Sequence, residues 1–470
     1  MPETRRFARP RIALLAIALT LACLAVPCAA QEAPRPRTIA VFGSSVASGS
    51  VDHEGKGGYA GRLGALLAPR GWKVVNVSRG GDNTIKIAPR FETDLLPQRA
   101  GYVIIGLSLA NEGIAKQRER AHRDAVYDQW RQGMQDLIAR CRNAGMIVVV
   151  GNCYANARFT DDAELYVYTR RMNAEISRWD VPSINFLGAI DDGTGAWADG
   201  FYADGGHPSA AGHEEMFRAI VPSLFEALEA RKPMPAKASG ARFARVAGGP
   251  GPGPALSFRP DDPVHSFAMS LWIRPGTSGA LAAVAGRMGA IRQERAQRGD
   301  AGYDVGFIEP GGETAIRTLE YRDGWIAYAH GDKAIACEIS NRQAWHHVVV
   351  SHGCARGETE LYLDGERFGS MPERILPEQF FLGGGAVPSG AAAAPQPAAG
   401  CDVKEWAVYR SALDGHAVKF IYEGGVFQSS LEVYAPLMDA EFSPGEPVEN
   451  RAQSMAEVEV IGPGLTPRED

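Results

Sequence analysis

The architecture of the N-terminal half is indicated by one short stretch, Thr38-Ile39-Ala40-Val41-Phe42-Gly43-Ser44-Ser45. The part up to Phe42 is mostly apolar and contains β-branched side chains, which is typical of a buried strand, and the glycine and serines after it mark a turn. Four similar runs follow, at 73–77, 102–107, 146–150 and 183–187.

Helix-length segments separate these runs. They lie at 59–68, 85–96, 124–144 and 162–179, and a last helix follows Pro208 to about Glu229. Short apolar strands that alternate with helices predict an α/β domain whose parallel sheet is covered on both faces. In such a sheet, ligands bind at the carboxyl ends of the strands.

In the C-terminal half, apolar residues recur at a different period, every second position. Proline- and glycine-rich sequence at 233–255 reads as a linker and the start of a second domain, and alternating patterns follow at 266–273 and 345–350. A strand at 360–363 runs into an Asp364-Gly365 hairpin turn, and the one clear helical pattern covers 411–423. We therefore predict an all-β sandwich or jelly roll, with a mobile loop at 390–400.

The composition of the chain limits the class of protein to which it can belong. The chain has 470 residues, 45% hydrophobic and 22% charged, with a formal net charge of −6. That is typical of globular protein with two or three domains, and the absence of a basic surplus argues against a nucleic-acid partner.

The first 30 residues read as a targeting segment. Arginines precede an apolar run at 12–27 that is shorter than the ~20 residues of a membrane-spanning helix, and Cys28-Ala29-Ala30 resembles a cleavage site. We predict a signal peptide at 1–30, a secreted or periplasmic protein and no membrane span in the mature chain. A membrane anchor and a lipoprotein are the alternatives.

Five cysteines remain after the signal peptide: Cys141, Cys153, Cys337, Cys354 and Cys401. An odd number cannot all pair within one chain. Cys337 and Cys354 lie on segments that could be neighbouring strands, so either a disulfide there or buried free thiols is expected. No Cys or His spacing is typical of a zinc site, and no metal is expected in the first domain.

Polar residues follow the strands of the first half. Ser45 follows the first strand, Gly81 the second and Asn111 the third, and Asp204 and His207 stand three residues apart before the last helix. A serine hydroxyl needs an imidazole to accept its proton, and the imidazole needs a carboxylate to fix its tautomer. Backbone N–H groups and a neutral amide suit an oxyanion. The order of these residues places all of them at one edge of the sheet.

With these motifs, residues 37–230 resemble the SGNH, or GDSL-type, hydrolase superfamily of esterases and lipases, which has a flavodoxin-like three-layer α/β/α fold. The resemblance implies that Ser45 is the nucleophile, His207 the base and Asp204 its orienting group. The Ser45 N–H, the Gly81 N–H and the Asn111 side chain would form the oxyanion hole. No cofactor is expected for catalysis.

The sequence departs from the family pattern in places. Ser44 stands where aspartate is usual, so Ser44 competes with Ser45, and Gly80 competes with Gly81. Glu112 follows Asn111 where aspartate is common. Arg79 either binds an anionic substrate group or is a surface residue. The remaining histidines that we considered are expected to be structural or surface residues: His53, His122, His213, His346 and His347.

Residues 238–462 resemble the laminin-G-like, concanavalin A-like jelly roll, through 267–275, 345–348, 361–365, 403–409 and a late returning strand at 431–437. Such domains often bind carbohydrate or protein, and some hold structural calcium. Tyr321, Trp325 and Tyr328 form either a sugar-stacking platform or part of the core. The domain boundaries expected are 31–232 for the hydrolase, 238–462 for the jelly roll and 463–470 for a tail.

Together these features predict a secreted serine esterase that acts through an acyl-enzyme on O-acetyl or short-acyl esters, with a small molecule or a polysaccharide as substrate. The carbohydrate part rests on association with the second domain and with export. A general short-chain carboxylesterase or lipase is one alternative. A non-enzymatic carbohydrate-binding or adhesion protein is another.

Overall fold

The computed structural model describes residues 35–160, 162–249, 255–298, 301–330, 333–384 and 398–470. The expected signal peptide at 1–30 and most of the expected mobile loop at 390–400 lie outside these residues. Residues 36–470 form one compact unit. No helix among the described residues is long and apolar enough to cross a membrane.

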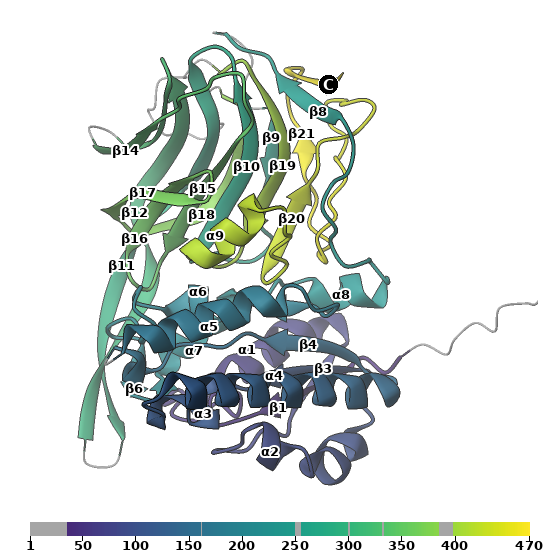
Figure 1. Cartoon of the computed structure of the whole chain (residues 1–470), viewed down its shortest axis with the longest axis vertical. Coiled ribbons are helices and arrows are strands. Elements are labelled where there is room, and N and C mark those ends of the chain that lie inside the picture. The colour runs from purple at the N-terminus through teal and green to yellow at the C-terminus, as the bar shows by residue number, and fades with distance from the viewer. Residues whose placement is uncertain (1–34, 161, 250–254, 299–300, 331–332, 385–397) are drawn as a thin grey trace, which may run out of the picture. The chain divides into compact units, whose positions relative to one another are not determined.

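A five-stranded parallel sheet forms the centre of the N-terminal half, with the strand order β2-β1-β3-β4-β5 (Figure 1). This is the flavodoxin-like order, and it confirms the predicted α/β class. The elements are β1 (Thr38–Gly43), α1 (Gly58–Leu67), β2 (Lys73–Asn76), α2 (Thr84–Ile87), β3 (Tyr102–Gly106), α3 (Leu109–Glu112), α4 (Arg120–Asn143), β4 (Ile147–Gly151), α5 (Ala163–Ile176), β5 (Ser183–Ile184), α6 (Leu187–Ile190), β6 (Tyr202–Asp204), β7 (His207–Pro208), α7 (Ala210–Arg218) and α8 (Leu224–Glu229).

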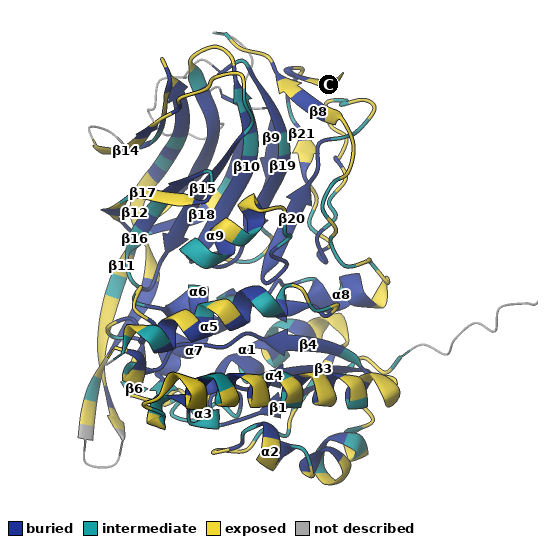
Figure 2. Cartoon of the chain, in the orientation of Figure 1, coloured by how far each residue is buried: buried dark blue, intermediate teal, exposed yellow. Residues whose placement is uncertain are grey.

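Alternation along the strands divides the sheet between two cores. In β1, Ile39 and Val41 belong to the core shared with α1, α7 and α8, whereas Ala40 and Phe42 belong to the core shared with α4 and α5. Successive strand side chains point to opposite faces, so an apolar strand can pack against a helical layer on each side. Figure 2 shows α4 and α5 with one buried and one exposed stripe, as expected of helices that cover a sheet.

Two predicted helices are interrupted by proline. The segment expected as one helix at 85–96 contains α2, which ends before Pro89, and then a short π-helical turn, Phe91–Leu95. The helix expected from Pro208 to Glu229 is divided into α7 and α8, and Pro222 lies between them. Proline lacks the N–H that continues a helix and clashes with the preceding turn. The strand expected at 183–187 is also short, because α6 begins at Leu187.

The C-terminal half is an antiparallel all-β sandwich, as predicted. One sheet has the order β17-β16-β15-β10-β19-β8-β22, with β20 also paired to β19, and the other has the order β14-β13-β12-β11-β18-β9-β21. The elements are β8 (Arg242–Val246), β9 (Leu256–Phe258), β10 (Phe267–Pro275), β11 (Gly279–Arg298), β12 (Ala301–Arg322), β13 (Trp325–His330), β14 (Lys333–Glu338), β15 (His346–Gly353), β16 (Glu358–Leu363), β17 (Glu366–Pro372), β18 (Ile375–Leu382), β19 (Cys401–Tyr409), α9 (Gly415–Tyr422), β20 (Leu431–Ala435), β21 (Glu459–Val460) and β22 (Leu465–Glu469).

Two details of this half differ from expectation. Residues 463–470 are not a tail, because β22 pairs with β8 and completes an edge of the sheet. Cys337 and Cys354 form no disulfide: Cys337 lies in β14 of one sheet, whereas Cys354 follows β15 of the other. All five described cysteines are buried free thiols, and burial raises the pKa of the Cys337 thiol to about 12.

The two halves share a core. Apolar side chains of the second half pack into the same cluster as α1, α7 and α8: Ala296, Val305, Phe307, Ile308, Cys354, Ala355 and Leu376. Four of them belong to the long β11–β12 hairpin, which extends past the sandwich beside the N-terminal half (Figure 1). The Gly306 N–H of β12 donates to the Gly200 carbonyl at 2.9 Å, just before β6.

Candidate active site

The turn after β1 separates the two adjacent serines. A side chain at Gly43 would place its Cβ 2.2 Å from the Gly106 carbonyl oxygen at the end of β3, so only glycine fits this close approach. Ser44 is fully buried, and its Oγ lies 3.1 Å from the Tyr154 hydroxyl. Ser45 is half-buried, and its Oγ lies 2.9 Å from Nε2 of His207.

The histidine is held by its own hairpin. His207 Nδ1 lies 2.8 and 3.0 Å from the two carboxylate oxygens of Asp204, and the Gly206 N–H donates to the same carboxylate at 2.8 Å. The Gly205 carbonyl accepts hydrogen bonds from Trp197 Nε1 and from the Ala157 N–H, which anchor the turn to neighbouring loops. The structure therefore brings Ser45, His207 and Asp204 into one continuous hydrogen-bonded row.

The environment keeps His207 available as a base. Its side chain is 23% exposed, and this partial burial lowers the pKa of the imidazole because the charged form is poorly solvated. A neutral imidazole with Nδ1–H directed at a carboxylate presents an unprotonated Nε2 to the serine hydroxyl.

The glycine loop lies against the serine. A Cβ at Gly80 would be 3.8 Å from the Cβ of Ser45, and the next residue, Gly81, has a φ of 81°, a conformation that favours glycine. In the part of the chain that the structure describes, no backbone hydrogen bond is donated by the amides of Ser45 or Gly81. Among the described residues, these two amides therefore have no backbone acceptor.

Asn111 lies in α3, the short helix after β3, and one of its Nδ2 protons is donated to the Asp82 carbonyl at 2.9 Å. The adjacent Glu112 accepts the Thr84 N–H at 2.6 Å. These two hydrogen bonds join the loop after β3 to the loop after β2, so Asn111 is held beside Gly81. Within the described part of the chain, no acceptor is found for the other Nδ2 proton.

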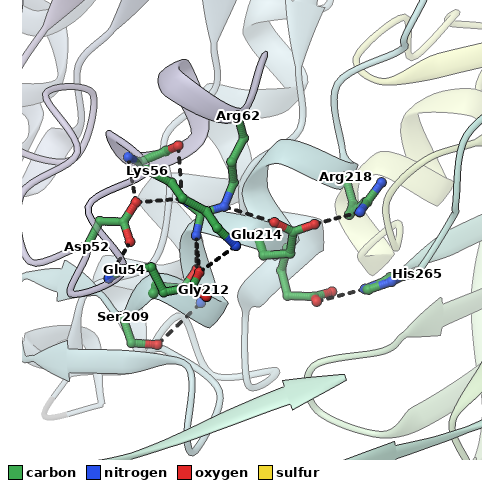
Figure 3. Close-up of polar contacts among 12 residues, drawn as sticks. Asp52, Glu54, Lys56, Arg62, Ser209, Gly212, Glu214, Arg218 and His265 are labelled. Atoms are coloured by element: carbon green, nitrogen blue, oxygen red, sulfur yellow. Dashed lines mark hydrogen bonds and ion pairs between the residues drawn. The ribbon is translucent and has the colours of Figure 1, made fainter. Parts of the chain in front are cut away.

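A buried arginine joins the segments that carry the serine and the histidine (Figure 3). Arg62 of α1, with a side chain only 4% exposed, pairs with Asp52 at 2.6 Å and Glu54 at 2.9 Å, both in the loop that follows Ser45. It also pairs with Glu214 of α7 at 2.8 Å and donates to the Ala210 carbonyl. We call Arg62, Asp52, Glu54 and Glu214 the Arg62 cluster.

Sequence reasoning missed the Arg62 cluster. Its members are separated by up to 162 positions and form no motif, so no local pattern identifies them. Tyr154, which holds Ser44 away from His207, was missed for the same reason.

The other residues singled out from the sequence take structural positions. Arg79 is 65% exposed and pairs with Asp94 at 3.1 Å. His213 is fully buried behind the Ser45 loop, with Nε2 3.2 Å from the Ser50 carbonyl oxygen, and burial lowers its pKa to about 4. His346 and His347 are buried in β15, whereas His122 is exposed on α4.

His53 contacts the second half through Tyr303, whose hydroxyl is 3.4 Å from Nδ1. The aromatic platform considered for the second half is not formed, because Tyr321 and Tyr328 are 2% and 1% exposed and belong to the core. Only Trp325 of that group is exposed. Among the described residues, no group of three or more His, Cys, Asp or Glu side chains is placed to hold a metal ion. Calcium binding stays a prediction without an assigned site.

The sequence matches two family models. Residues 41–215 match the GDSL-like Lipase/Acylhydrolase family, and residues 253–419 match the Concanavalin A-like lectin/glucanases superfamily. The chain thus carries a GDSL-like acylhydrolase domain, which spans the Ser45, Asp204 and His207 row, followed by a concanavalin A-like domain. Both resemblances inferred from the sequence are confirmed.

Several solved structures are similar to this chain. They include Axe2, an acetylxylan esterase from Geobacillus stearothermophilus (16% identity, 38% of this chain and 90% of that chain covered, TM-score 0.32). A GDSL-like lipase from Bacteroides thetaiotaomicron has 14% identity, with 42% and 88% covered and a TM-score of 0.31. LAE5, an alpha/beta hydrolase enzyme from the metagenome of Lake Arreo, Spain, has 18% identity, with 38% and 91% covered and a TM-score of 0.30. A comparison with curated proteins finds no match.

Proposed function

We propose that the protein is a serine esterase that hydrolyses carboxylic esters through an acyl-enzyme. The observation that carries this proposal is the 2.9 Å contact between Ser45 Oγ and His207 Nε2, with the Asp204 carboxylate on the opposite nitrogen of the same ring. A hydroxyl, an imidazole and a carboxylate in this order are the groups that nucleophilic acyl transfer needs.

In the acylation step, Ser45 Oγ attacks the ester carbonyl carbon while His207 Nε2 accepts the hydroxyl proton. Asp204 holds Nδ1–H and stabilises the imidazolium that forms. The tetrahedral intermediate then collapses: the bond to the alcohol oxygen breaks, His207 returns the proton to that oxygen, and the acyl group remains on Ser45.

In the deacylation step, water replaces the alcohol. The water oxygen attacks the acyl carbon while His207 Nε2 accepts a proton from the water. The bond between the acyl carbon and Ser45 Oγ then breaks, His207 delivers the proton to Ser45 Oγ, and the carboxylic acid leaves. In both steps, negative charge develops on the former carbonyl oxygen. The amides of Ser45 and Gly81 and the Asn111 side chain would donate to this oxygen, and neutral donors held in place need no reorganisation as the charge forms.

For the substrate, we propose O-acetyl or other short-acyl esters on carbohydrate. The concanavalin A-like domain supports the carbohydrate part, although by association alone. We further propose that residues 1–30 are a signal peptide and that the protein acts outside the cytoplasm, on the basis of the arginines and the short apolar run in that segment. No cofactor is proposed for catalysis.

The proposal is tested by the hydrolysis of p-nitrophenyl acetate by the purified protein and its Ser45→Ala variant. We expect Ser45→Ala to lower kcat by at least about 10⁴-fold, because the oxyanion donors alone supply only a residual rate. Ser44→Ala is the matched control and should retain activity within about tenfold. Turnover by Ser45→Ala at the wild-type rate would refute the assignment of the nucleophile.

A further inference from the structure

A cavity of about 700 Å³ lies between the two halves of the chain. The N-terminal half contributes Glu54 and Lys56, from the loop after Ser45, and Glu214 and Arg218 of α7. The second half contributes residues 259–265 and parts of β11, β12 and β18. We call this space the interdomain cavity. Its volume is within the range of sites that bind small molecules.

The charges that line the interdomain cavity nearly cancel. Six carboxylates and five Lys or Arg side chains face it, besides His265. Four of the five cations are already paired: Lys56 with Glu54, Arg218 with Glu214 and Asp262, Arg287 with Glu378, and Arg292 with Glu309. At these four cations an anionic ligand would have to displace a carboxylate, and at their partners a cationic ligand would have to displace a guanidinium or an ammonium group. Arg259 and Asp261 form no ion pair among the described residues, but their charges are opposite, so together they add no net charge to the lining.

The same lining is rich in hydrogen-bonding atoms. Carboxylates that are paired with one cation retain lone pairs that can accept further hydrogen bonds. Arg259, the fifth cation, donates only to the neutral side chain of Gln379, at 2.9 Å. Hydrogen bonds from hydroxyl groups to charged partners of this kind are stronger than those between neutral groups.

Apolar surface completes the lining. Four prolines and two aliphatic side chains also line the cavity: Pro260, Pro263, Pro310, Pro377, Ile308 and Leu376. The Arg292 guanidinium lies 4.8 Å from the centre of the Phe307 ring, so a cation–π contact covers this part of the apolar wall. A ligand that combines apolar C–H faces with many hydroxyl groups matches such a surface.

The interdomain cavity is lined in part by the loop that follows Ser45 and by the helix that follows His207. Glu54 and Lys56 lie 9 and 11 residues after Ser45, and α7 begins three residues after His207. The Arg62 cluster fixes these two segments to each other (Figure 3). His53 in the same loop contacts Tyr303 of the hairpin, which also supplies Phe307 to the cavity wall.

We propose that the interdomain cavity binds an uncharged glycan chain, the alcohol part of the ester substrate. This inference rests on the proposed function, because its kinetic test measures ester hydrolysis. It deepens that function by specifying a neutral polyhydroxylated substrate rather than a uronate polymer. It also explains why the two halves are joined: each contributes one wall of the binding site.

The test uses the full chain and the double variant Arg259→Ala/Asp261→Ala. Both residues are exposed, and neither forms an ion pair recorded among the described residues, so their removal leaves the paired network intact. Substrates are a panel of neutral acetylated glycans (xylan, glucomannan and cellulose acetate), acetylated homogalacturonan as the charged counterpart, and p-nitrophenyl acetate. The matched control is Arg131→Ala/Asp128→Ala, an ion pair on α4 outside the interdomain cavity.

For at least one neutral glycan, we expect the ratio of kcat/KM on the glycan to kcat/KM on p-nitrophenyl acetate to fall at least tenfold in the cavity variant. The control should keep the ratio within twofold. In the wild type, KM for acetylated homogalacturonan should exceed that for the neutral glycan at least tenfold. A cavity variant with an unchanged ratio on every neutral glycan, or equal KM values for the charged and neutral polymers, would overturn the proposal.

Binding is measured separately by calorimetry in the Ser45→Ala background, with acetylated xylan and glucomannan oligosaccharides as probes. If no ester is hydrolysed but a neutral oligosaccharide binds and the cavity variant weakens that binding tenfold, the esterase proposal fails and the binding site stands. If esters are hydrolysed but no neutral oligosaccharide binds, or binding is equal in the cavity variant, the binding site fails and the esterase stands.

Discussion

His207 connects the serine and the aspartate, and its partial burial has a consequence for the pH dependence of the reaction. The imidazole must be neutral to accept the Ser45 proton, and burial places its pKa below the ordinary value of about 6.5. We therefore expect kcat/KM for p-nitrophenyl acetate to be constant near neutral pH and to fall on the acid side with a midpoint below about 6.5. A profile that is flat down to pH 4 would contradict the role of His207.

Of the three donors proposed for the oxyanion hole, the Asn111 side chain is the one that a substitution removes most directly, because the other two are backbone groups. Asn111→Ala should lower kcat for p-nitrophenyl acetate by about 10²–10³-fold, with a smaller change in KM, because the donor acts mainly in the transition state. Asn143→Ala, at the exposed end of α4, is the control. Equal losses of activity in the two variants, or none in Asn111→Ala, would exclude this role.

Adjacent residues of one type differ in role only through their tertiary contacts. Ser44 and Ser45 are chemically identical, and the family resemblance favours Ser45 with Ser44 as a competitor. Ser44 points to the buried Tyr154 hydroxyl and Ser45 to the imidazole. The turn after β1 directs the two side chains to different neighbours, and the fold determines which of them meets the histidine.

At the scale of elements, the Arg62 cluster joins α1, the loop after Ser45 and α7. Arg62→Met leaves the Asp52 carboxylate, whose side chain is 1% exposed, without its buried counter-ion. Removal of one partner from a buried pair is strongly destabilising, so we expect a loss of about 3–5 kcal/mol in the free energy of unfolding at pH 7, measured by urea denaturation. Arg131→Met on the surface of α4 should cost less than about 1 kcal/mol.

The pH dependence of the stability lost in Arg62→Met tests whether the loss comes from the Asp52 carboxylate. Burial by itself raises the pKa of Asp52, but the Arg62 guanidinium and the Gly58 N–H outweigh burial, and the pKa lies below its ordinary value. Such a carboxyl contributes stability above its unfolded pKa of about 3.9, and the contribution is lost as pH falls through the folded pKa. The difference between wild type and Arg62→Met should therefore shrink below about pH 4. A difference independent of pH would contradict this explanation.

Element boundaries show what local sequence can and cannot predict. The five parallel strands and the hairpin at Asp364-Gly365 were predictable, because period and turn residues act over a few positions. Pro89 and Pro222 are local signals for a helix interruption as well. The apolar periodicity continues on both sides of each proline, however, and predicts an unbroken helix. The long β11–β12 hairpin was not predicted, because its sequence alternates only in short stretches, such as 303–307, and charged residues and glycines interrupt the pattern.

At the scale of the whole molecule, the two halves share one apolar cluster and should unfold together. Leu376 of β18 is 7% exposed and packs in the cluster centred on the N-terminal half. Leu376→Ala should cost about 2–5 kcal/mol and lower the midpoint of one common calorimetric transition. Phe368→Ala, 50% exposed on β17, is the control and should have little effect. Two separate transitions, with only one shifted by Leu376→Ala, would show that the halves are energetically independent.

The two fold classes, the order of the strand-end loops and the residue types that acyl transfer requires can be predicted from the amino-acid sequence, because periodicity, turns and motif spacing are properties of neighbouring residues. The three-dimensional packing was needed to show that Ser44 faces Tyr154 while Ser45 meets His207, that Cys337 and Cys354 lie in different sheets, and that the Arg62 cluster and the interdomain cavity exist. Each of these features depends on side chains that are distant along the chain and become neighbours only when the layers pack. The packing of complete elements, rather than any local propensity, selects those neighbours.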